Sequence, residues 1–157
     1  MVTNNWGGPK DKRMNINQFC LPVDGIASRY PGIRSPFCIG RWMYASDRRI
    51  CVRIPATARV IPVGAVPKAN LLFKNFRAAK CTEPWPGDKV VEMDRDECGR
   101  LVIPPAMKIG NRKVDTGYWF VVWQLGEVQY NPAGNPEDPV QFVAGDLQGL
   151  LQPIARP

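Results

Sequence analysis

The stretch that decides the fold is "FCIGRWMYASDRRICVRIP", residues 37–55. A strand-like alternation over 50–54 follows a polar corner, which predicts a β-hairpin with strands at 37–46 and 49–54. Asp47 lies at the polar corner, where an aspartate tolerates turn geometry and accepts hydrogen bonds from nearby backbone amides. The alternation in the second strand places Arg53 opposite the apolar residues, where we expect it to be exposed.

Outward from this hairpin, the chain carries more strand signals than helix signals. Its 16 prolines and 14 glycines favour many turns and short strands. The run "GYWFVVWQL", residues 117–125, is rich in aromatic residues and valines and predicts a central, doubly buried strand. Further strands are expected at 89–93, 100–104 and 127–130, and a second hairpin is expected at 140–144 and 147–154.

The best helix candidate is "KANLLFKNFRAAK", residues 68–80. Leu72, Phe76 and Ala79 are spaced i, i+4 and i+7 and would share its apolar face. A second short helix is expected near residue 15, ended by Pro22. We therefore predict the α+β class, with a mainly antiparallel β-sheet and one or two short helices.

The length and composition indicate an ordinary globular protein. A chain of 157 residues fits one domain. Hydrophobic residues make up 45% of it and charged residues 22%, so a packed core can form. We expect a flexible basic leader at 1–13 and a single α+β domain at 14–157.

The charge of the chain is unevenly distributed. Residues 1–80 hold 14 Lys or Arg against 3 acids, and residues 81–157 hold 7 against 11, so the halves carry +11 and −4. A basic half attracts duplex DNA or an acidic protein partner, and this attraction weakens with salt. A solvated basic surface without a ligand is the competing interpretation.

The chain has five cysteines and no histidine. The odd number and wide spacing of the cysteines argue against a disulfide framework, and scattered thiolates alone make a poor metal site. The acidic turn "DRDE", residues 94–97, has carboxylates that could hold a divalent cation, but a charged turn explains it equally well. We expect reduced thiols in a cytoplasmic protein, without a metal, a cofactor or a membrane span.

The sequence gives little support for catalysis. Without histidine, the commonest general base is missing, and neither a Ser-His nor a Cys-His pair can form. The chain contains no Walker loop, GxGxxG or GxSxG motif. We therefore predict that the protein is not an enzyme.

Two tryptophans are candidate aromatic anchors for a partner. Trp85 lies between prolines in "EPWPG", where extended backbone could present its indole, although capping the core is the alternative. Trp6 lies in the polar leader and would stack on a base or fill a partner's pocket, unless the leader is only a linker.

The hairpin segment "YASDRRICVRIP" resembles the Ala-Thr-Asp-Gly hairpin of the bacterial DNA polymerase III β sliding clamp family. The corresponding positions are Ala45, Ser46, Asp47, Arg49 and Ile50, and Arg48 stands where those clamps have glycine. The end of the chain, "VQFVAGDLQGLLQPIAR", is similar to the close of a clamp chain and keeps Pro153 and Arg156 of its pattern. Small phage and mobile-element proteins also carry similar segments.

The resemblance implies a single clamp-like domain that contacts duplex phosphates without reading sequence, in a homo-oligomer. The residues expected at this nucleic-acid or partner interface are Lys74, Arg77 and Lys80 on the predicted helix, and Arg48, Arg49 and Arg53 on the hairpin. Two alternatives stay open: a small phage-type protein that inhibits an acidic host protein of defence or replication, and a virion structural component.

Overall fold

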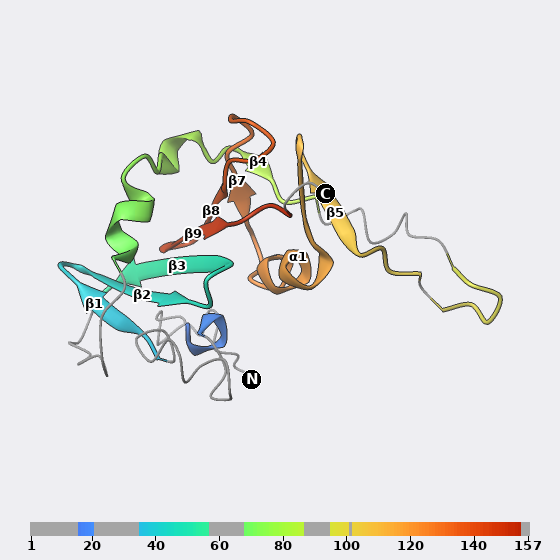
Figure 1. Cartoon of the computed structure of the whole chain (residues 1–157), viewed down its shortest axis with the longest axis horizontal. Helices are drawn as coiled ribbons and strands as arrows, with labels where there is room; N and C mark the ends of the chain where they lie inside the picture. The colour runs from blue at the N-terminus through green and yellow to red at the C-terminus, as the bar shows by residue number, and fades with distance from the viewer. Residues whose placement is uncertain (1–15, 21–34, 57–67, 87–94, 101, 155–157) are drawn as a thin grey trace. The chain divides into compact units, whose positions relative to one another are not determined.

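The computed structural model describes residues 16–20, 35–56, 68–86, 95–100 and 102–154 (Figure 1). The chain forms two compact units. Unit 1 comprises Met1–Phe76 and Gly145–Leu150, and unit 2 comprises Arg77–Ala144 and Leu151–Pro157. The first boundary lies close to residue 80, where the charge of the sequence changes from basic to acidic. The expected leader at 1–13 lies outside the described residues.

Unit 1 is built on a sheet with the strand order β1-β2-β3-β9. Its strands are β1 (Phe37–Ile39), β2 (Trp42–Ser46), β3 (Ile50–Pro55) and β9 (Leu147–Leu151). Because β2 and β3 pair antiparallel, the hairpin predicted in this stretch is confirmed. The prediction missed the turn that splits the first strand into β1 and β2, where Gly40 has a φ of 62° that glycine adopts without steric cost.

Side-chain hydrogen bonds close the corner between β2 and β3. Asp47 Oδ1 accepts hydrogen bonds from the backbone N–H groups of Arg49 (2.9 Å) and Ile50 (3.0 Å), as expected of a corner aspartate. Ser46 Oγ accepts a hydrogen bond from the Arg48 amide at 3.1 Å and donates one to the Ile50 carbonyl at 3.0 Å. Arg48 has a φ of 84°, the only positive φ of a non-glycine residue in the described part of the chain.

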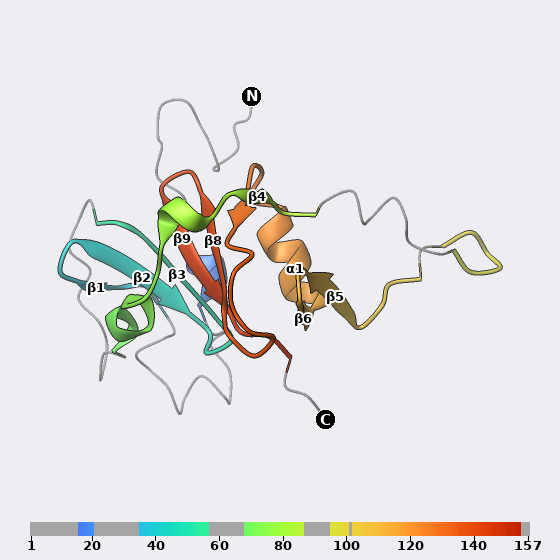
Figure 2. The same cartoon turned by 90° about the horizontal axis from the view of Figure 1, so that it is seen from above.

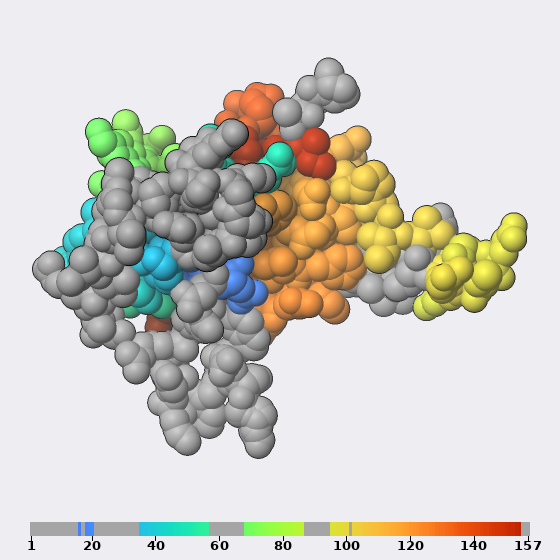
Figure 3. Space-filling model, turned by 60° about the horizontal axis from the view of Figure 1, so that its bottom comes forward, coloured from blue at the N-terminus to red at the C-terminus, as the bar shows by residue number. Residues whose placement is uncertain are grey.

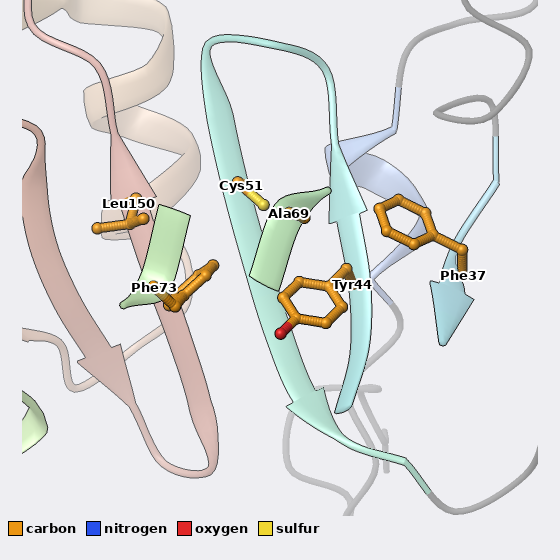
Figure 4. Close-up of a cluster of buried hydrophobic side chains, with 6 residues drawn as sticks. All are labelled: Phe37, Tyr44, Cys51, Ala69, Phe73 and Leu150. Atoms are coloured by element: carbon orange, nitrogen blue, oxygen red, sulfur yellow. The ribbon is translucent and has the colours of Figure 1, made fainter. Parts of the chain in front are cut away.

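Strand β3 is buried on both of its faces, which corrects the expectation of one exposed face. Cys51 and Val52, on opposite faces, are 4% and 0% exposed, and Arg53 is half-buried. One face is covered by a cluster that β1, β2, β3, β9 and the segment after Lys68 contribute: Phe37, Tyr44, Cys51, Ala69, Phe73 and Leu150 (Figure 4). The helix expected near residue 15 is a single 3-10 turn, η1 (Asn17–Phe19), which contacts β2 and β3.

The segment 68–80 does not form the predicted α-helix. It forms two 3-10 turns, η4 (Ala69–Phe73) and η5 (Ala78–Lys80). Neither of the preceding residues, Lys68 and Arg77, caps its turn with a side-chain hydrogen bond, so the free amides at the helix start are not satisfied in that way. The Arg77 backbone N–H donates instead to Gln141 Oε1 at 3.0 Å, and this interrupts the helical ladder.

The buried face of η4 also differs from the prediction. Ala69 and Phe73 are buried, whereas Leu72 is exposed. Ala69, Phe73 and Phe76 are themselves spaced i, i+4 and i+7, so the periodicity allowed two faces. Aromatic packing selects one of them, because the Phe73 ring lies 5.8 Å from the Tyr44 ring and 5.4 Å from the Phe76 ring.

Unit 2 contains two groups of paired strands and a helix. Strands β4 (Glu83–Pro84), β7 (Gln129–Tyr130) and β8 (Val140–Ala144) have the order β8-β7-β4 and pair antiparallel. Strands β5 (Ala106–Ile109) and β6 (Arg112–Asp115) form a separate antiparallel pair. Helix α1 (Thr116–Trp123) contacts both strands of this pair and lies beside them in both cartoon views (Figure 2).

Helix α1 occupies the run that was predicted to be a buried strand, so that prediction is wrong. Asp115 caps the helix by accepting a hydrogen bond from the Gly117 amide at 2.8 Å, and Gly126, with a φ of 99°, follows its end. Trp119 and Trp123, one turn apart, stack with their ring centroids 6.0 Å apart. These caps and i, i+4 contacts outweigh the β propensity of the aromatic residues, which depends strongly on context.

The fold class is confirmed, because the protein is mostly antiparallel β-sheet with one α-helix in the described residues. The strands predicted at 140–144 and from 147 are present as β8 and β9, and the strand predicted at 127–130 is limited to β7. Residues 102–104 form no strand, and the strand predicted at 89–93 lies outside the described residues. Where the chain is described, its helices are too short or too polar to cross a bilayer.

Candidate functional site

The structure divides the six predicted interface cations between the two units. Arg48, Arg49, Arg53 and Lys74 belong to unit 1, and Arg77 and Lys80 belong to unit 2. All of them are exposed except Arg53, which is half-buried. The single basic helix face that was expected to carry three of them does not exist, because its residues lie on separate turns.

Arg53 is held between two aromatic rings. Its guanidinium carbon lies 4.1 Å from the centroid of the Trp42 ring and 4.2 Å from that of Phe73. Its Nε donates a hydrogen bond to Gln148 Oε1 at 2.9 Å, and its Nη1 donates one to the Tyr44 hydroxyl at 3.2 Å. The planar guanidinium of arginine can stack on aromatic rings and donate several hydrogen bonds at once. Lysine cannot combine these contacts, so arginine suits this position better.

This arrangement gives Arg53 a positioning role. Trp42 belongs to β2 and Phe73 to η4, so the guanidinium connects the 3-10 turn to the sheet. Phe73 also belongs to the buried cluster, which Figure 4 shows. The sequence pattern missed this role, because alternation alone describes which face a residue occupies and not what covers that face.

Arg48 and Arg49 lie at the exposed corner between β2 and β3. The positive φ of Arg48 is a conformation that costs a residue with a side chain about 1–2 kcal/mol, and that glycine adopts freely. The resemblance to sliding clamps expects glycine here. Arg48 is thus a strained turn residue whose side chain is exposed.

The η4 turn exposes both cationic and apolar side chains. Lys68 and Lys74 are exposed on either side of it, and Leu71 and Leu72 are 58% and 61% exposed. The space-filling view shows the green atoms of the segment that contains η4 at the surface (Figure 3). Sequence reasoning had placed Leu72 in the core. The sequence could not show that Leu72 is exposed, because only the tertiary contacts of Phe73 decide which face of η4 is buried.

The sequence around these residues lacks acids. Between Asp47 and Glu83 there is no Asp or Glu, and the stretch 48–82 holds eight cations: Arg48, Arg49, Arg53, Arg59, Lys68, Lys74, Arg77 and Lys80. Carboxylates flank this stretch, as Asp47 and Glu83, but do not occur within it. Such a stretch raises the local concentration of anionic partners.

Of the two predicted cations of unit 2, Arg77 precedes η5 and Lys80 is its last residue. The Lys80 amide donates to the Arg77 carbonyl at 3.0 Å, which closes this 3-10 turn. Gln141 on β8 accepts from the Arg77 amide, and the Cys81 thiol lies 3.6 Å from the Gln141 carbonyl oxygen. The turn is therefore attached to β8 by its backbone, and the Lys80 side chain is exposed.

Trp85 is packed inside unit 2. It is 6% exposed, and its ring makes edge contacts with Tyr130 at 6.1 Å and Phe142 at 5.8 Å between centroids. Its backbone N–H donates to the Val128 carbonyl at 2.9 Å. In this conformation the indole is not presented to a partner, and the alternative of a core-capping tryptophan describes its surroundings. Trp6 lies outside the described residues.

Arg112 is a buried cation that the sequence pattern did not single out. It is 2% exposed, and it donates from Nε to the Asp138 carbonyl at 3.0 Å and from Nη2 to the Ala133 carbonyl at 2.7 Å. Burial lowers the pKa of the guanidinium, and the neighbouring Asp138 carboxylate acts in the opposite direction. Nη1 has no hydrogen-bond partner among the described residues. Arg112 therefore holds the loop 131–139 through its backbone carbonyls.

The buried thiols of Cys51 and Cys81 and the half-buried thiol of Cys20 are not activated as nucleophiles. Desolvation raises the pKa of Cys51 from the ordinary thiol value of 9.0 to about 12, and raises the pKa of Cys20 and of Cys81 to about 11. A raised pKa leaves little thiolate at neutral pH, and the thiolate is the reactive form. In the described part of the chain, His, Cys, Asp and Glu side chains nowhere gather in groups of three that could hold a metal.

No protein-family model, curated protein or solved structure matches this chain. The resemblance to sliding clamps, which rests on short motifs, therefore stays a prediction. The residues themselves carry the functional argument.

Proposed function

We propose that this protein is a non-enzymatic binding protein whose unit 1 binds an acidic macromolecule. The observation that carries the proposal is the acid-free stretch 48–82, which exposes Arg48, Arg49, Lys68 and Lys74 in unit 1. Their shared chemistry is the attraction of an array of anionic oxygens. Both the phosphates of duplex DNA and the carboxylates of an acidic protein provide such an array.

The groups available for chemistry support a binding role. The chain has no histidine, and burial holds its internal thiols in the protonated form. Arg53 and Arg112 are engaged with rings and backbone carbonyls inside the fold. The lysines and arginines that are exposed can act on a partner through charge.

A charge-reversal pair tests the proposal. In Lys68→Glu/Lys74→Glu, two exposed cations of unit 1 become acids. In the matched control, Lys108→Glu/Lys113→Glu, two exposed lysines that lie opposite each other on β5 and β6 are reversed. Each pair changes the net charge by −4, from +7 to +3. Fluorescence anisotropy with labelled polyglutamate and with a labelled DNA duplex measures binding at low and at physiological salt.

We expect the wild type to bind at least one probe with an affinity that falls as salt rises. The unit 1 pair should weaken this binding, and the control pair should leave it largely intact. The proposal fails if the wild type binds neither probe at low salt. It also fails if both pairs weaken binding equally, because net charge and not unit 1 would then be responsible.

A further inference from the structure

The η4 turn exposes two adjacent leucines from a firmly anchored base. Leu71 and Leu72 are 58% and 61% exposed, whereas Ala69 and Phe73 of the same turn are buried. Figure 4 shows the buried pair among the side chains of the unit 1 cluster. Scattered exposed apolar residues are ordinary on protein surfaces. Leu71 and Leu72 are neighbours on a short turn, so together they form an apolar protrusion. Its exposure to water is unfavourable in free energy.

Two lysines flank this protrusion at the spacing of the turn. The Leu71 amide donates to the Lys68 carbonyl at 3.1 Å, and the Lys74 amide donates to the Leu71 carbonyl at 3.3 Å. In a 3-10 helix, side chains three residues apart eclipse one another. Leu71 and Lys74 thus lie on one edge of the turn, Lys68 is the residue that precedes the turn, and Leu72 follows Leu71.

From this edge we infer that the acidic partner is a protein with an apolar pocket bordered by Asp or Glu side chains. This inference rests on the proposed function and names its partner. DNA phosphates are contacted by cationic and polar groups, and exposed leucines add nothing to such contacts. Protein interfaces combine an apolar anchor in a pocket with a polar rim. The leucines therefore favour a protein over a duplex.

The surroundings of η4 suit such an anchor. The Phe73 ring packs against Tyr44 and against the guanidinium of Arg53, which in turn lies on the Trp42 ring. These contacts hold the turn in one place before binding. An anchor that is ordered beforehand loses less conformational entropy when a partner binds, which favours affinity.

Selection from a displayed library of random peptides tests the partner's chemistry without knowledge of the partner. The wild-type chain is the target, and selected peptides are then measured by fluorescence anisotropy. Leu71→Ser/Leu72→Ser removes the apolar anchors. The matched control, Val102→Ser/Ile103→Ser, changes an adjacent pair of exposed apolar residues in unit 2. All four residues are exposed, so neither variant should disturb folding.

We expect the selected peptides to combine Asp or Glu with large apolar residues. In the double variant, the loss of each leucine should weaken the binding of these peptides about tenfold, because each leucine would be partly buried in the complex. The control should bind as the wild type does. The inference is overturned if the leucine variant binds the peptides like the wild type, or if the peptides are acidic without apolar residues.

The outcomes separate this inference from the proposed function. If a DNA duplex is bound, if Lys68→Glu/Lys74→Glu weakens that binding, and if the library yields no leucine-dependent peptide, the partner is a nucleic acid. The inference then fails while the proposed function stands. If neither polyglutamate nor the duplex is bound, the proposed function itself fails.

Discussion

Replacement of Arg53 by lysine tests whether the aromatic pair and the fork of donors stabilise unit 1. Lysine keeps the positive charge and most of the aliphatic stem, but it lacks the planar guanidinium. The substitution removes the hydrogen bonds to Gln148 Oε1 (2.9 Å) and the Tyr44 hydroxyl (3.2 Å). It also weakens the contacts with the Trp42 and Phe73 rings, which lie 4.1 Å and 4.2 Å from the guanidinium carbon.

The magnitude follows from these contacts. A hydrogen bond contributes a net stabilisation of about 1 kcal/mol, and a cation–π contact at a partly exposed site contributes about 0.5–1 kcal/mol, part of which an ammonium keeps. We therefore expect Arg53→Lys to lower the free energy of unfolding by about 2 kcal/mol. For a chain of this size, the melting temperature should fall by about 4–8 °C.

Thermal and urea denaturation, followed by circular dichroism and tryptophan fluorescence, measure this effect. The control is Arg49→Lys, the same replacement at an exposed turn position, which should change stability by less than about 0.5 kcal/mol. A double-mutant cycle with Phe73→Leu should show that Arg53 and Phe73 are coupled by about 0.5–1 kcal/mol. Equal effects of the two Arg→Lys replacements, or independence of Arg53 and Phe73, would refute the reasoning.

Three further predictions concern the interior. Gly134→Ala should cost about 2 kcal/mol in urea denaturation, because its Cβ would overlap Nη2 of the buried Arg112 and its φ is 120°. The cost should be smaller in an Arg112→Ala background, and an equal cost would show that the overlap is unimportant. Iodoacetamide at about pH 8 should alkylate the exposed Cys98 in the native protein and the buried Cys51 only after unfolding, as peptide mass spectrometry would show. Stability should fall as pH rises from 9.0 towards about 12, because the unfolded Cys51 thiol ionises in this window while the folded one keeps its proton. The urea midpoint of Cys51→Ala should depend less steeply on pH over the same range, and an unchanged slope would contradict this assignment.

The hairpins were predictable because their signals are local. Alternation and the corner aspartate identify β2 and β3 from neighbouring residues alone, and Asp47 makes the amide hydrogen bonds that its residue type suggests. The same holds for β8 and β9, which are separated by Gly145 and Asp146. Short-range patterns of this kind need no knowledge of the rest of the fold.

Helix α1 shows where local signals conflict. Its aromatic and valine run has strand propensity, whereas Asp115 before it and Gly126 after it are helix cap signals. The sequence contains both signals, and the strand propensity of the run predicts an element that the caps contradict. Propensity in a strand reflects packing on a half-buried surface, and here the packing partners are one helical turn away.

The exposure of most predicted interface cations agrees with the sequence, and their binding role stays a prediction. The residue types and the basic character of the region follow from the sequence, and Arg48, Arg49, Lys74, Arg77 and Lys80 are exposed as a binding role requires. Their grouping on one helix was wrong, because two 3-10 turns replace the helix. The exposure of Leu71 and Leu72 was not predicted.

The sequence by itself determined the β-rich class, the hairpin corner at Asp47 and the acid-free stretch that follows it. These features depend only on residue order and composition, which can be read directly from the sequence. Only the tertiary structure decided that Arg53 lies between aromatic rings and that Phe73, not Leu72, enters the core. The physical reason is that two faces of η4 have similar apolar periodicity, and the difference between them comes from contacts with strands far away in the sequence.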